Sequence, residues 1–233
     1  MSSLLKPSDA AYGETPLGRC RIFIGKECAG NILPGEMPVV IDNLRASSTI
    51  VTALACGVEE IIPVTRDEDA LSLQKKGIVI AGESGGVKLP GYDLGNSPIE
   101  LLRRAEQQPF KTMAFKTSNL IPLLAALPHS WICSSLNLQA MASYLTHKDV
   151  CIIAAGGEKG VSEDLAVAIA LHSHLNHAPF DEHLIAHFIQ ESPAAHHLAS
   201  IGYAEDVRFT ARVNIYDIIP YYDGKTIKRA DLH

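Results

Sequence analysis

Short runs of apolar residues alternate along the chain with longer segments in which apolar and polar residues are mixed. Residues 37–42, which are apolar up to Asp42, and residues 150–155 are typical of central strands that are buried on both faces of a sheet. Residues 49–56 and 162–176 have the length and composition of helices. Strands that alternate with helices predict an α/β protein whose mostly parallel sheet is covered on both faces.

The same pattern extends over most of the chain. Residues 1–16 are polar and contain prolines and a glycine, so we expect a flexible N-terminal segment followed by a single α/β domain over residues 17–233. Further strands are expected at 21–25, 60–64, 78–81, 112–115 and 131–134, helices at 67–76, 98–105, 121–126, 138–144, 182–191 and 194–201, and strand-like segments near 213–219.

Polar clusters follow several of the predicted strands. They are Asp42-Asn43-Leu44-Arg45, Gly82-Glu83, Lys116-Thr117-Ser118-Asn119 and Gly156-Gly157. In parallel α/β sheets, ligands bind outside the carboxyl ends of the strands. Residues 82–98 also form the longest irregular stretch in the middle of the chain, and such loops are usually functional. We therefore expect these clusters to converge on one site.

Charge and composition narrow the class of protein. The formal net charge is −6 and the pI is near 5.9, which argues against nucleic acid or an anionic membrane as a partner. No apolar run approaches the length of a transmembrane helix, and the N-terminus does not have the pattern of a signal peptide. The five cysteines are odd in number and lack a C-x-x-C motif, so we expect free thiols and a cytoplasmic location. A homo-oligomer is compatible with these features.

The segment 42–49 has the most informative chemistry. An apolar strand ends in Asp42, and Arg45 and three hydroxyl residues follow at once before a helix. A helix N-terminus offers unpaired N–H groups to an anion, and an arginine grips an oxyanion with two donors. Asp42 is an oxygen ligand suited to Mg²⁺. The alternative is that Asp42 or Ser47 only caps the helix.

Two further segments offer carboxylates beside glycines. Glu83 lies in the turn 82–86 and is either a metal ligand or base, or an exposed residue of a tight turn. Glu163 and Asp164 either complement a helix dipole or add to a divalent-metal site. In the segment 91–98, Ser97 is expected to cap the helix that Pro98 opens.

Other familiar motifs are absent or incomplete. The loop 154–160 does not match G-x-G-x-x-G, and Asp223-Gly224-Lys225-Thr226 lacks the earlier glycine of a Walker A motif. His183 and His187 have the i, i+4 spacing of a metal pair but no H-E-x-x-H, so we interpret them as helix-surface residues. No G-x-S-x-G elbow occurs.

Taken together, the blocks resemble the 2-phosphosulfolactate phosphatase family. Its members have I-D-V-L-R-A-T-T-T, then G-E-R-G-G, G-[FY]-D-L-G-N-S-P, T-T-T-N-G-T and A-G-x-x-G before a helix with E-D. The corresponding blocks here are residues 41–49 (IDNLRASST), 82–86 (GESGG), 91–98 (GYDLGNSP), 116–121 (KTSNLI) and 155–157 (AGG) leading to Glu163-Asp164. The likeness extends in order from about residue 37 to 175.

The resemblance implies a three-layer α/β/α sandwich with a mostly parallel or mixed sheet, and an Mg²⁺-dependent phosphatase. Such an enzyme converts 2-phosphosulfolactate to sulfolactate and phosphate, a step toward coenzyme M. Four positions depart from the family pattern. Asn43 replaces a valine, Ser84 replaces an arginine, and Leu120 and Ile121 replace a glycine and a threonine. We expect Leu120 and Ser84 to make the pocket narrower or less charged, with a weaker contact to a sulfonate or carboxylate, unless Lys116 supplies the charge.

We therefore predict a divalent-metal-dependent phosphomonoesterase that binds a small anionic phosphorylated substrate. Asp42, Glu83 and Arg45 are the predicted catalytic residues, and Asp42, Glu83 and Asp164 the predicted Mg²⁺ ligands. Either a metal-activated water or Asp42 itself attacks phosphorus. The alternatives are a non-catalytic binder of small anionic metabolites and a phosphatase for a different phosphorylated acid. The residues predicted to bind the substrate anions are Ser47, Ser48, Thr49, Asn96 and Asn119.

Overall fold

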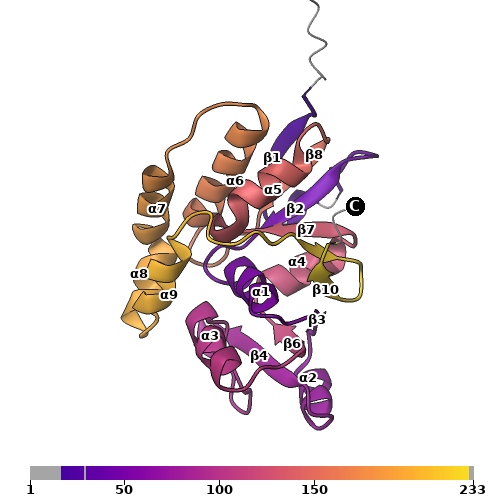
Figure 1. The fold of residues 1–233 in the computed structure, drawn as a ribbon, viewed down its shortest axis with the longest axis vertical. Helices are drawn as coiled ribbons and strands as arrows, with labels where there is room; N and C mark the ends of the chain where they lie inside the picture. The colour runs from indigo at the N-terminus through magenta and orange to yellow at the C-terminus, as the bar shows by residue number, and fades with distance from the viewer. Residues whose placement is uncertain (1–16, 29, 231–233) are drawn as a thin grey trace, which may run out of the picture.

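The computed structural model describes residues 17–28 and 30–230, so the predicted flexible segment 1–16 lies outside the described residues. The helices of the described part alternate with strands over most of its length (Figure 1). The strands are β1 (Cys20–Ile24), β2 (Met37–Ile41), β3 (Glu60–Pro63), β4 (Val79–Ser84), β5 (Val87–Lys88), β6 (Thr112–Lys116), β7 (Ser130–Cys133), β8 (Val150–Ala154), β9 (Pro220–Tyr222) and β10 (Ile227–Arg229).

The helices follow the predicted positions with small shifts of their ends. The α-helices are α1 (Ala46–Ala55), α2 (Asp67–Gln74), α3 (Pro98–Gln107), α4 (Leu120–Ala126), α5 (Leu138–Leu145), α6 (Ser162–Leu175), α7 (Glu182–Gln190), α8 (Pro193–Ser200) and α9 (Ala204–Thr210), and the 3-10 helices are η1 (Gly25–Cys28) and η2 (Ser135–Asn137). Ser97 caps α3 as predicted, because its side-chain oxygen accepts a hydrogen bond from the Glu100 N–H at 3.0 Å.

The described strands form one mixed sheet with the order β1-β8-β2-β7-β9-β10-β3-β6-β4-β5. Strands β1, β8, β2 and β7 are parallel to one another, and so are β3, β6 and β4. Strands β9 and β10 join these two parallel groups through antiparallel pairings with β7, with each other and with β3. Three antiparallel pairings in succession mean that the two groups run in opposite directions.

The twist of the sheet explains how both groups serve one site. Six pairings separate β2 from β4 in the strand order. At roughly 20–25° of twist per pairing, the accumulated rotation is about 120–150°. Because the two groups also run in opposite directions, this rotation turns the carboxyl ends of β2 and β4 toward the same side of the molecule.

Helices cover both faces of the sheet. Val39 and Ile41 of β2 pack in a core with α5, α6 and α7, whereas Val40 between them packs in the other large core with α1, α3 and α4. Successive side chains of a strand point to opposite faces, so a strand buried on both faces contributes to both cores. The residues of β8 divide in the same way. The predicted three-layer α/β/α architecture is confirmed.

The region after residue 203 differs from the prediction. The segment 213–219 contains no strand, and the N–H groups of Asn214, Ile215 and Tyr216 donate instead to carbonyl groups of Ser135 and Leu136 in η2. The strands in this region lie later, at β9 and β10, and α9 precedes them. These elements were missed because α9 and both strands are too short to give a clear apolar period.

The segment 82–98 is also more ordered than predicted. Strand β4 continues to Ser84 and pairs with β5 as a short antiparallel hairpin. Gly85 and Gly86 form its turn, with φ values of 60° and 86°. A two-residue hairpin with positive φ at both positions favours glycine.

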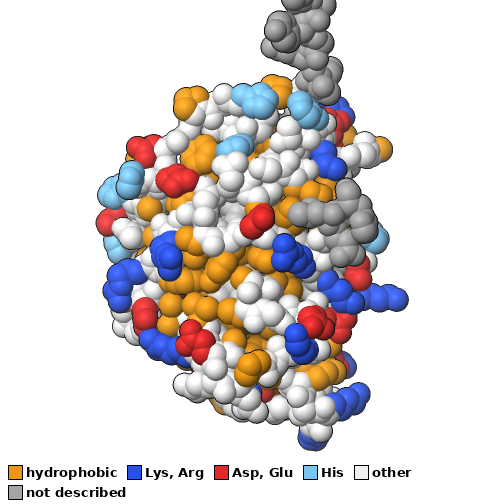
Figure 2. Space-filling model, viewed as in Figure 1, with side chains coloured by type: hydrophobic (Ala, Val, Ile, Leu, Met, Phe, Trp, Pro, Cys, Tyr) orange, Lys and Arg blue, Asp and Glu red, His pale blue; other side chains and the backbone are white. Residues whose placement is uncertain are grey.

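The surface seen in Figure 2 has Lys and Arg side chains interspersed with Asp and Glu around a central hydrophobic area. Among the residues that the structure describes, no helix combines the length and the apolar character needed to cross a bilayer.

Candidate active site

A pocket of about 500 Å³ opens where the carboxyl ends of the two parallel groups meet. Its lining includes Asp42 after β2, Glu83 in β4, Ser118 and Asn119 after β6, and the loop 156–160 after β8. The polar clusters that the sequence places at the ends of strands are therefore brought together. The pocket is strongly acidic, because Glu158, Glu163 and Asp164 also line it.

Asp42 is buried at the base of this pocket. Its backbone carbonyl accepts the Ser47 N–H at 2.8 Å. Within the part of the chain that the structure describes, its carboxylate accepts a single long hydrogen bond, of 3.4 Å, from the Ala46 N–H. Burial, followed by the charges of Glu83 and Glu163, raises the pKa of Asp42 to about 7. A carboxyl group with this pKa takes up and releases protons near neutral pH.

Asp164 joins the loops that follow β2 and β8. Its Oδ1 accepts the Asn43 N–H at 2.6 Å and its Oδ2 accepts the Gly156 N–H at 2.9 Å. Burial, followed by the charges of Asp42 and Glu163, raises the pKa of Asp164 well above its usual range. Burial also raises the pKa of Glu163. These carboxylates repel one another, so the pocket favours a positively charged ligand.

Glu83 is fixed by two backbone donors. Its Oε2 accepts the Gly86 N–H at 2.8 Å, within the β4–β5 turn, and its Oε1 accepts the Ser118 N–H at 2.7 Å. The side chain is buried and lines the pocket. Glu83 is therefore a rigid carboxylate that joins the hairpin to the β6–α4 loop, rather than an exposed residue of a tight turn.

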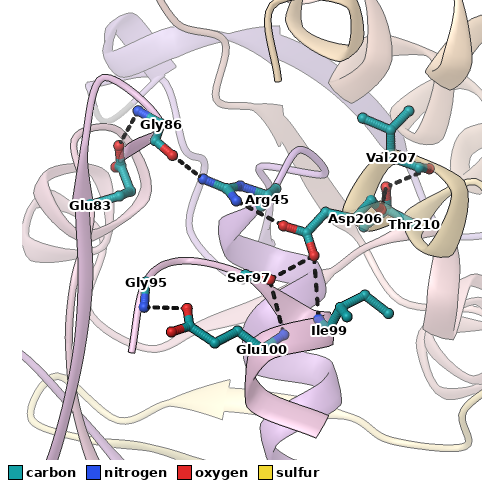
Figure 3. A network of polar contacts seen from close by, with 10 residues as sticks. All are labelled: Arg45, Glu83, Gly86, Gly95, Ser97, Ile99, Glu100, Asp206, Val207 and Thr210. Carbon is teal, nitrogen blue, oxygen red and sulfur yellow. Dashed lines mark hydrogen bonds and ion pairs between the residues drawn. The ribbon is translucent and has the colours of Figure 1, made fainter. Parts of the chain in front are cut away.

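Arg45 lines the pocket, and its guanidinium is fixed by hydrogen bonds to two acceptors (Figure 3). Its Nη1 donates to Asp206 Oδ2 at 2.8 Å, and its Nη2 donates to the Gly86 carbonyl. The guanidinium also lies over the Tyr203 ring, 4.1 Å from the ring centroid. These two hydrogen bonds use two of the five donors of a guanidinium.

The three hydroxyl residues after Arg45 lie in the first turn of α1 and do not line the pocket. Ser47 Oγ accepts the Asp42 N–H at 2.9 Å, and Ser48 Oγ donates to the Asn43 carbonyl at 2.8 Å. Thr49 Oγ1 is buried without a hydrogen-bond partner among the described residues. In this conformation the hydroxyl groups of Ser47 and Ser48 support the strand-to-helix turn, and the predicted substrate contacts stay predictions.

The two predicted asparagines line the pocket. Asn96 is 5% exposed, and its Oδ1 has no hydrogen-bond partner among the described residues, so a ligand with a donor group would satisfy it. Asn119 directly precedes α4 and lies against Gly157, where an added Cβ would approach Asn119 Nδ2 to 2.6 Å. Gly157 is therefore needed for the close contact between these two loops.

The sequence suggested that Leu120 and Lys116 face the pocket, but neither residue lines it. Leu120 is fully buried in the core around α1, α3 and α4, so it does not narrow the pocket. Lys116 is bound to Asp67 with an Nζ–Oδ1 distance of 2.7 Å, and it does not replace the missing arginine. Ser84, in contrast, is exposed and does line the pocket, as expected of the position where the family pattern has an arginine.

Sequence reasoning missed several residues of the site. Lys159 and His197 line the pocket, and Asp206 holds Arg45 although it does not line the pocket. Lys159 lies in the glycine loop and was visible in the sequence. His197 and Asp206 come from α8 and α9, which no local motif connects with the first helix.

The donor set of the pocket is compatible with Mg²⁺. Within the described ranges 17–28 and 30–230, no three acidic, histidine or cysteine side chains are grouped closely enough to form a ready-made metal cage. Mg²⁺ usually binds through one or two carboxylates and takes its other ligands from water and phosphate. The carboxylate of Asp42 is only weakly hydrogen-bonded, and the charges of Glu83 and Glu163 repel it. It is the best-placed protein ligand for such an ion.

Comparison with known proteins gives a consistent result. Residues 23–225 match the family model of 2-phosphosulpholactate phosphatase. A relative from Pseudothermotoga lettingae is 32% identical over 210 residues, which cover 82% of this chain and 92% of the relative. A relative from Thermotoga petrophila is 35% identical over 199 residues, which cover 78% of this chain and 87% of the relative.

A third relative, from Carboxydothermus hydrogenoformans, is 34% identical over 204 residues, which cover 78% of this chain and 84% of the relative. All three relatives carry the name "Probable 2-phosphosulfolactate phosphatase". The matched region contains Asp42, Arg45, Glu83 and Asp164. The chain therefore belongs to the 2-phosphosulfolactate phosphatase family and is a phosphatase, a phosphoric monoester hydrolase.

Proposed function

We propose that this chain is an Mg²⁺-dependent phosphatase that converts 2-phosphosulfolactate to sulfolactate and phosphate. One observation carries the proposal: in this member of the family, Asp42 after β2, Glu83 at the end of β4 and Asp164 in the first turn of α6 line one pocket together with Arg45. A substrate with several anionic groups needs cations, and Mg²⁺ with Arg45 and Lys159 supplies them. We also propose that the reaction takes place in the cytoplasm as a step toward coenzyme M.

Each residue has a distinct part in this proposal. A bound Mg²⁺ ion would polarise the phosphate ester and lower the pKa of a water molecule. Asp42 would hold this ion, and its carboxylate would either take the proton of the attacking water or attack phosphorus itself. Arg45 binds phosphate oxygens through the donors that Asp206 and Gly86 do not use. Glu83 keeps the hairpin against the β6–α4 loop and adds negative charge for the ion.

A different phosphorylated 2-hydroxy acid is the second candidate substrate. Ser84 stands where the family pattern has an arginine, and Lys116 is paired with Asp67 outside the pocket. The pocket therefore has one cation fewer than the family pattern implies. A substrate with fewer anionic groups requires fewer cations.

The test is a panel of phosphate esters assayed with Mg²⁺ and with excess chelator. The proposal predicts that 2-phosphosulfolactate has the highest kcat/KM, that chelator abolishes turnover, and that added Mg²⁺ restores it. Preference for another ester supports the second candidate, and ligand binding without turnover of any ester identifies a non-catalytic binder. Full activity in chelator excludes the metal-dependent mechanism.

Matched variants connect this activity with the pocket. Asp42→Asn removes the charge with little change of shape, and we expect kcat to fall by about 10²-fold or more, as for the loss of a general base or nucleophile. Asp69→Asn is the control, because Asp69 lies on α2 in a surface ion pair with Arg66. Mass spectrometry of rapidly quenched enzyme separates the two routes, since only the nucleophilic route leaves a phosphoryl group on Asp42.

A further inference from the structure

Asp206 is buried beside the pocket without lining it. Its Oδ2 accepts the hydrogen bond from Arg45 Nη1, and both side chains are only 2% exposed. Its Oδ1 accepts the Ser97 hydroxyl at 2.7 Å and the Ile99 N–H at 3.3 Å. Figure 3 shows both oxygens occupied, one toward Arg45 and the other toward the start of α3.

The other side of Arg45 reaches the β4–β5 turn. Arg45 Nη2 donates to the Gly86 carbonyl, and the Gly86 N–H donates in turn to Glu83 Oε2 at 2.8 Å. A continuous chain of polar contacts therefore extends from Asp206 through Arg45 and Gly86 to Glu83 (Figure 3). It joins α9 to two pocket residues that lie far from it in sequence.

The guanidinium of Arg45 is attracted by carboxylates of the pocket and by Asp206. Asp42, Glu83 and Asp164 line the same pocket as Arg45, whereas Asp206 is buried and does not line it. A guanidinium without Asp206 would be drawn toward the pocket carboxylates, because a buried charge seeks an opposite charge. In that position it would neutralise the carboxylates and leave the Gly86 carbonyl unpaired.

We propose that Asp206 is a positioning residue that acts through Arg45. It holds the guanidinium away from the pocket carboxylates, so that the remaining donors of Arg45 face the substrate anion and the Gly86 turn keeps Glu83 in place. The role in turnover rests on the proposed function, whereas the role in holding the turn does not. Tyr203 assists by stacking against the guanidinium.

Asp206→Asn tests the proposal, because it keeps the shape and replaces one accepting oxygen by an amide that cannot accept. We expect kcat/KM to fall tenfold or more and the inhibition constant of inorganic phosphate to rise at least fivefold. Asp206→Glu keeps the charge and should recover a large part of this loss. In an Arg45→Lys background, Asp206→Asn should cost much less, because the residue it positions is already changed.

Thr210→Val is the matched control within α9. Thr210 Oγ1 donates to the Asp206 backbone carbonyl at 3.0 Å and to the Val207 carbonyl at 3.2 Å. Figure 3 shows the contact with Val207, on the side of α9 away from Arg45. Thr210→Val weakens the same short helix, so we expect its Tm to fall about as much as that of Asp206→Asn while its inhibition by phosphate stays unchanged. This result would separate a positioning role of Asp206 from a general loss of stability. If Asp206→Asn retains kcat/KM and the phosphate inhibition constant within twofold of wild type, the role in turnover is wrong.

Hydrogen exchange at the Gly86 amide is a readout that does not depend on activity. We expect exchange at least tenfold faster in Asp206→Asn and unchanged in Thr210→Val. Unchanged exchange in Asp206→Asn overturns the role in holding the turn. If wild type hydrolyses no ester, the proposed function fails, and this exchange experiment still decides on Asp206.

Tyr203→Leu decides the matter if Asp206→Asn does not fold. It removes the aromatic face under Arg45 without leaving a buried charge unpaired. We expect kcat/KM to fall at least threefold and exchange at the Gly86 amide to become faster. A Tyr203→Leu variant with wild-type kinetics and wild-type exchange contradicts the proposal.

Discussion

At the scale of single residues, the environment of each side chain decides what its chemistry accomplishes. Asp42 is a carboxylate at the end of a strand, and burial together with its acidic neighbours raises its pKa to about 7. Arg45 is an arginine before a helix, and its position depends on Asp206 and Gly86. The residue types are readable in the sequence, but these partners are not.

The first residue-scale prediction concerns Arg45→Lys. Lysine keeps the charge but loses the planar fork that joins Asp206 to Gly86 and the stacking on Tyr203. We expect kcat/KM to fall by about tenfold or more, which corresponds to about 1.4 kcal/mol or more of transition-state stabilisation. Steady-state kinetics on the preferred ester provide the measurement.

The control for this change is Arg103→Lys. Arg103 forms an exposed ion pair with Glu205, which lies at the start of α9, the helix that also contains Asp206. Exposed pairs contribute little, so its kinetics should equal those of wild type. Arg45→Lys kinetics within twofold of wild type would remove Arg45 from the site.

The second residue-scale prediction concerns Ser84→Arg. Ser84 lines the pocket at the β4–β5 turn, where the family pattern has an arginine. A restored charge should lower KM for 2-phosphosulfolactate about fivefold, near the ~1 kcal/mol upper range of an exposed ion pair, and leave an ester without a second anion unchanged. Ser84→Gln adds bulk without charge and should have no such effect. Equal changes for both esters would contradict the prediction.

At the scale of elements, packing decides the role of α4. The sequence places Leu120 where the family pattern has a loop glycine, which suggested a narrower pocket. The structure shows that Leu120 begins α4 and points into the core. Its side chain therefore contributes to stability, and restoring glycine would not widen the pocket.

The prediction for this element is that Leu120→Gly destabilises the protein. Removing a fully buried leucine side chain costs about 2–5 kcal/mol, and glycine adds roughly 1 kcal/mol in a helix. Denaturant unfolding would measure the difference. Ala125→Gly at an exposed position of α4 tests the helix term alone and should cost about 1 kcal/mol. Equal costs for the two variants would show that Leu120 contributes nothing by packing.

At the scale of the whole molecule, a partly buried ion pair ties an edge strand of the sheet to the rest of the fold. Glu36 precedes β2, its side chain is fully buried, and its Oε1 accepts the Nε–H of Arg21 in β1 at 2.8 Å. Its Oε2 also accepts the Leu33 N–H at 2.8 Å. The hydrogen bonds from Arg21 are the main cause of a lowered pKa of Glu36. This pair ties the edge strand β1 to the segment that precedes β2.

The lowered pKa predicts a loss of stability in acid. A group whose pKa is lower in the folded state stabilises that state above its unfolded pKa, near 4.5 here, and loses the effect as the pH falls through the folded pKa. Glu36→Gln should therefore lower the free energy of unfolding by about 2 kcal/mol at pH 7, and the difference should shrink below pH 4.5.

Denaturant unfolding at several pH values measures this effect. Glu59→Gln is the control, because the Glu59–Lys111 pair is 68% exposed on both sides and should contribute little. A Glu36→Gln difference that is the same at pH 7 and at pH 3 would contradict the assignment to the charged pair.

The sequence by itself determined the local structure and most of the chemistry of this protein. Continuous apolar runs predicted β2 and β8, and the cap Ser97 followed by Pro98 predicted the start of α3. The order of the motif blocks identified the family. These features are local, because each depends on residues within a few positions of one another.

The tertiary structure alone decided how these parts combine. The two strand groups run in opposite directions because β9 and β10, near the C-terminus, pair between them. The twist accumulated over these pairings brings the carboxyl ends of the two groups together. The partnership of Arg45 with Asp206 joins positions 161 residues apart. Contacts at such separations depend on the packing of the whole sheet and its helices, so no pattern within a short stretch of sequence specifies them.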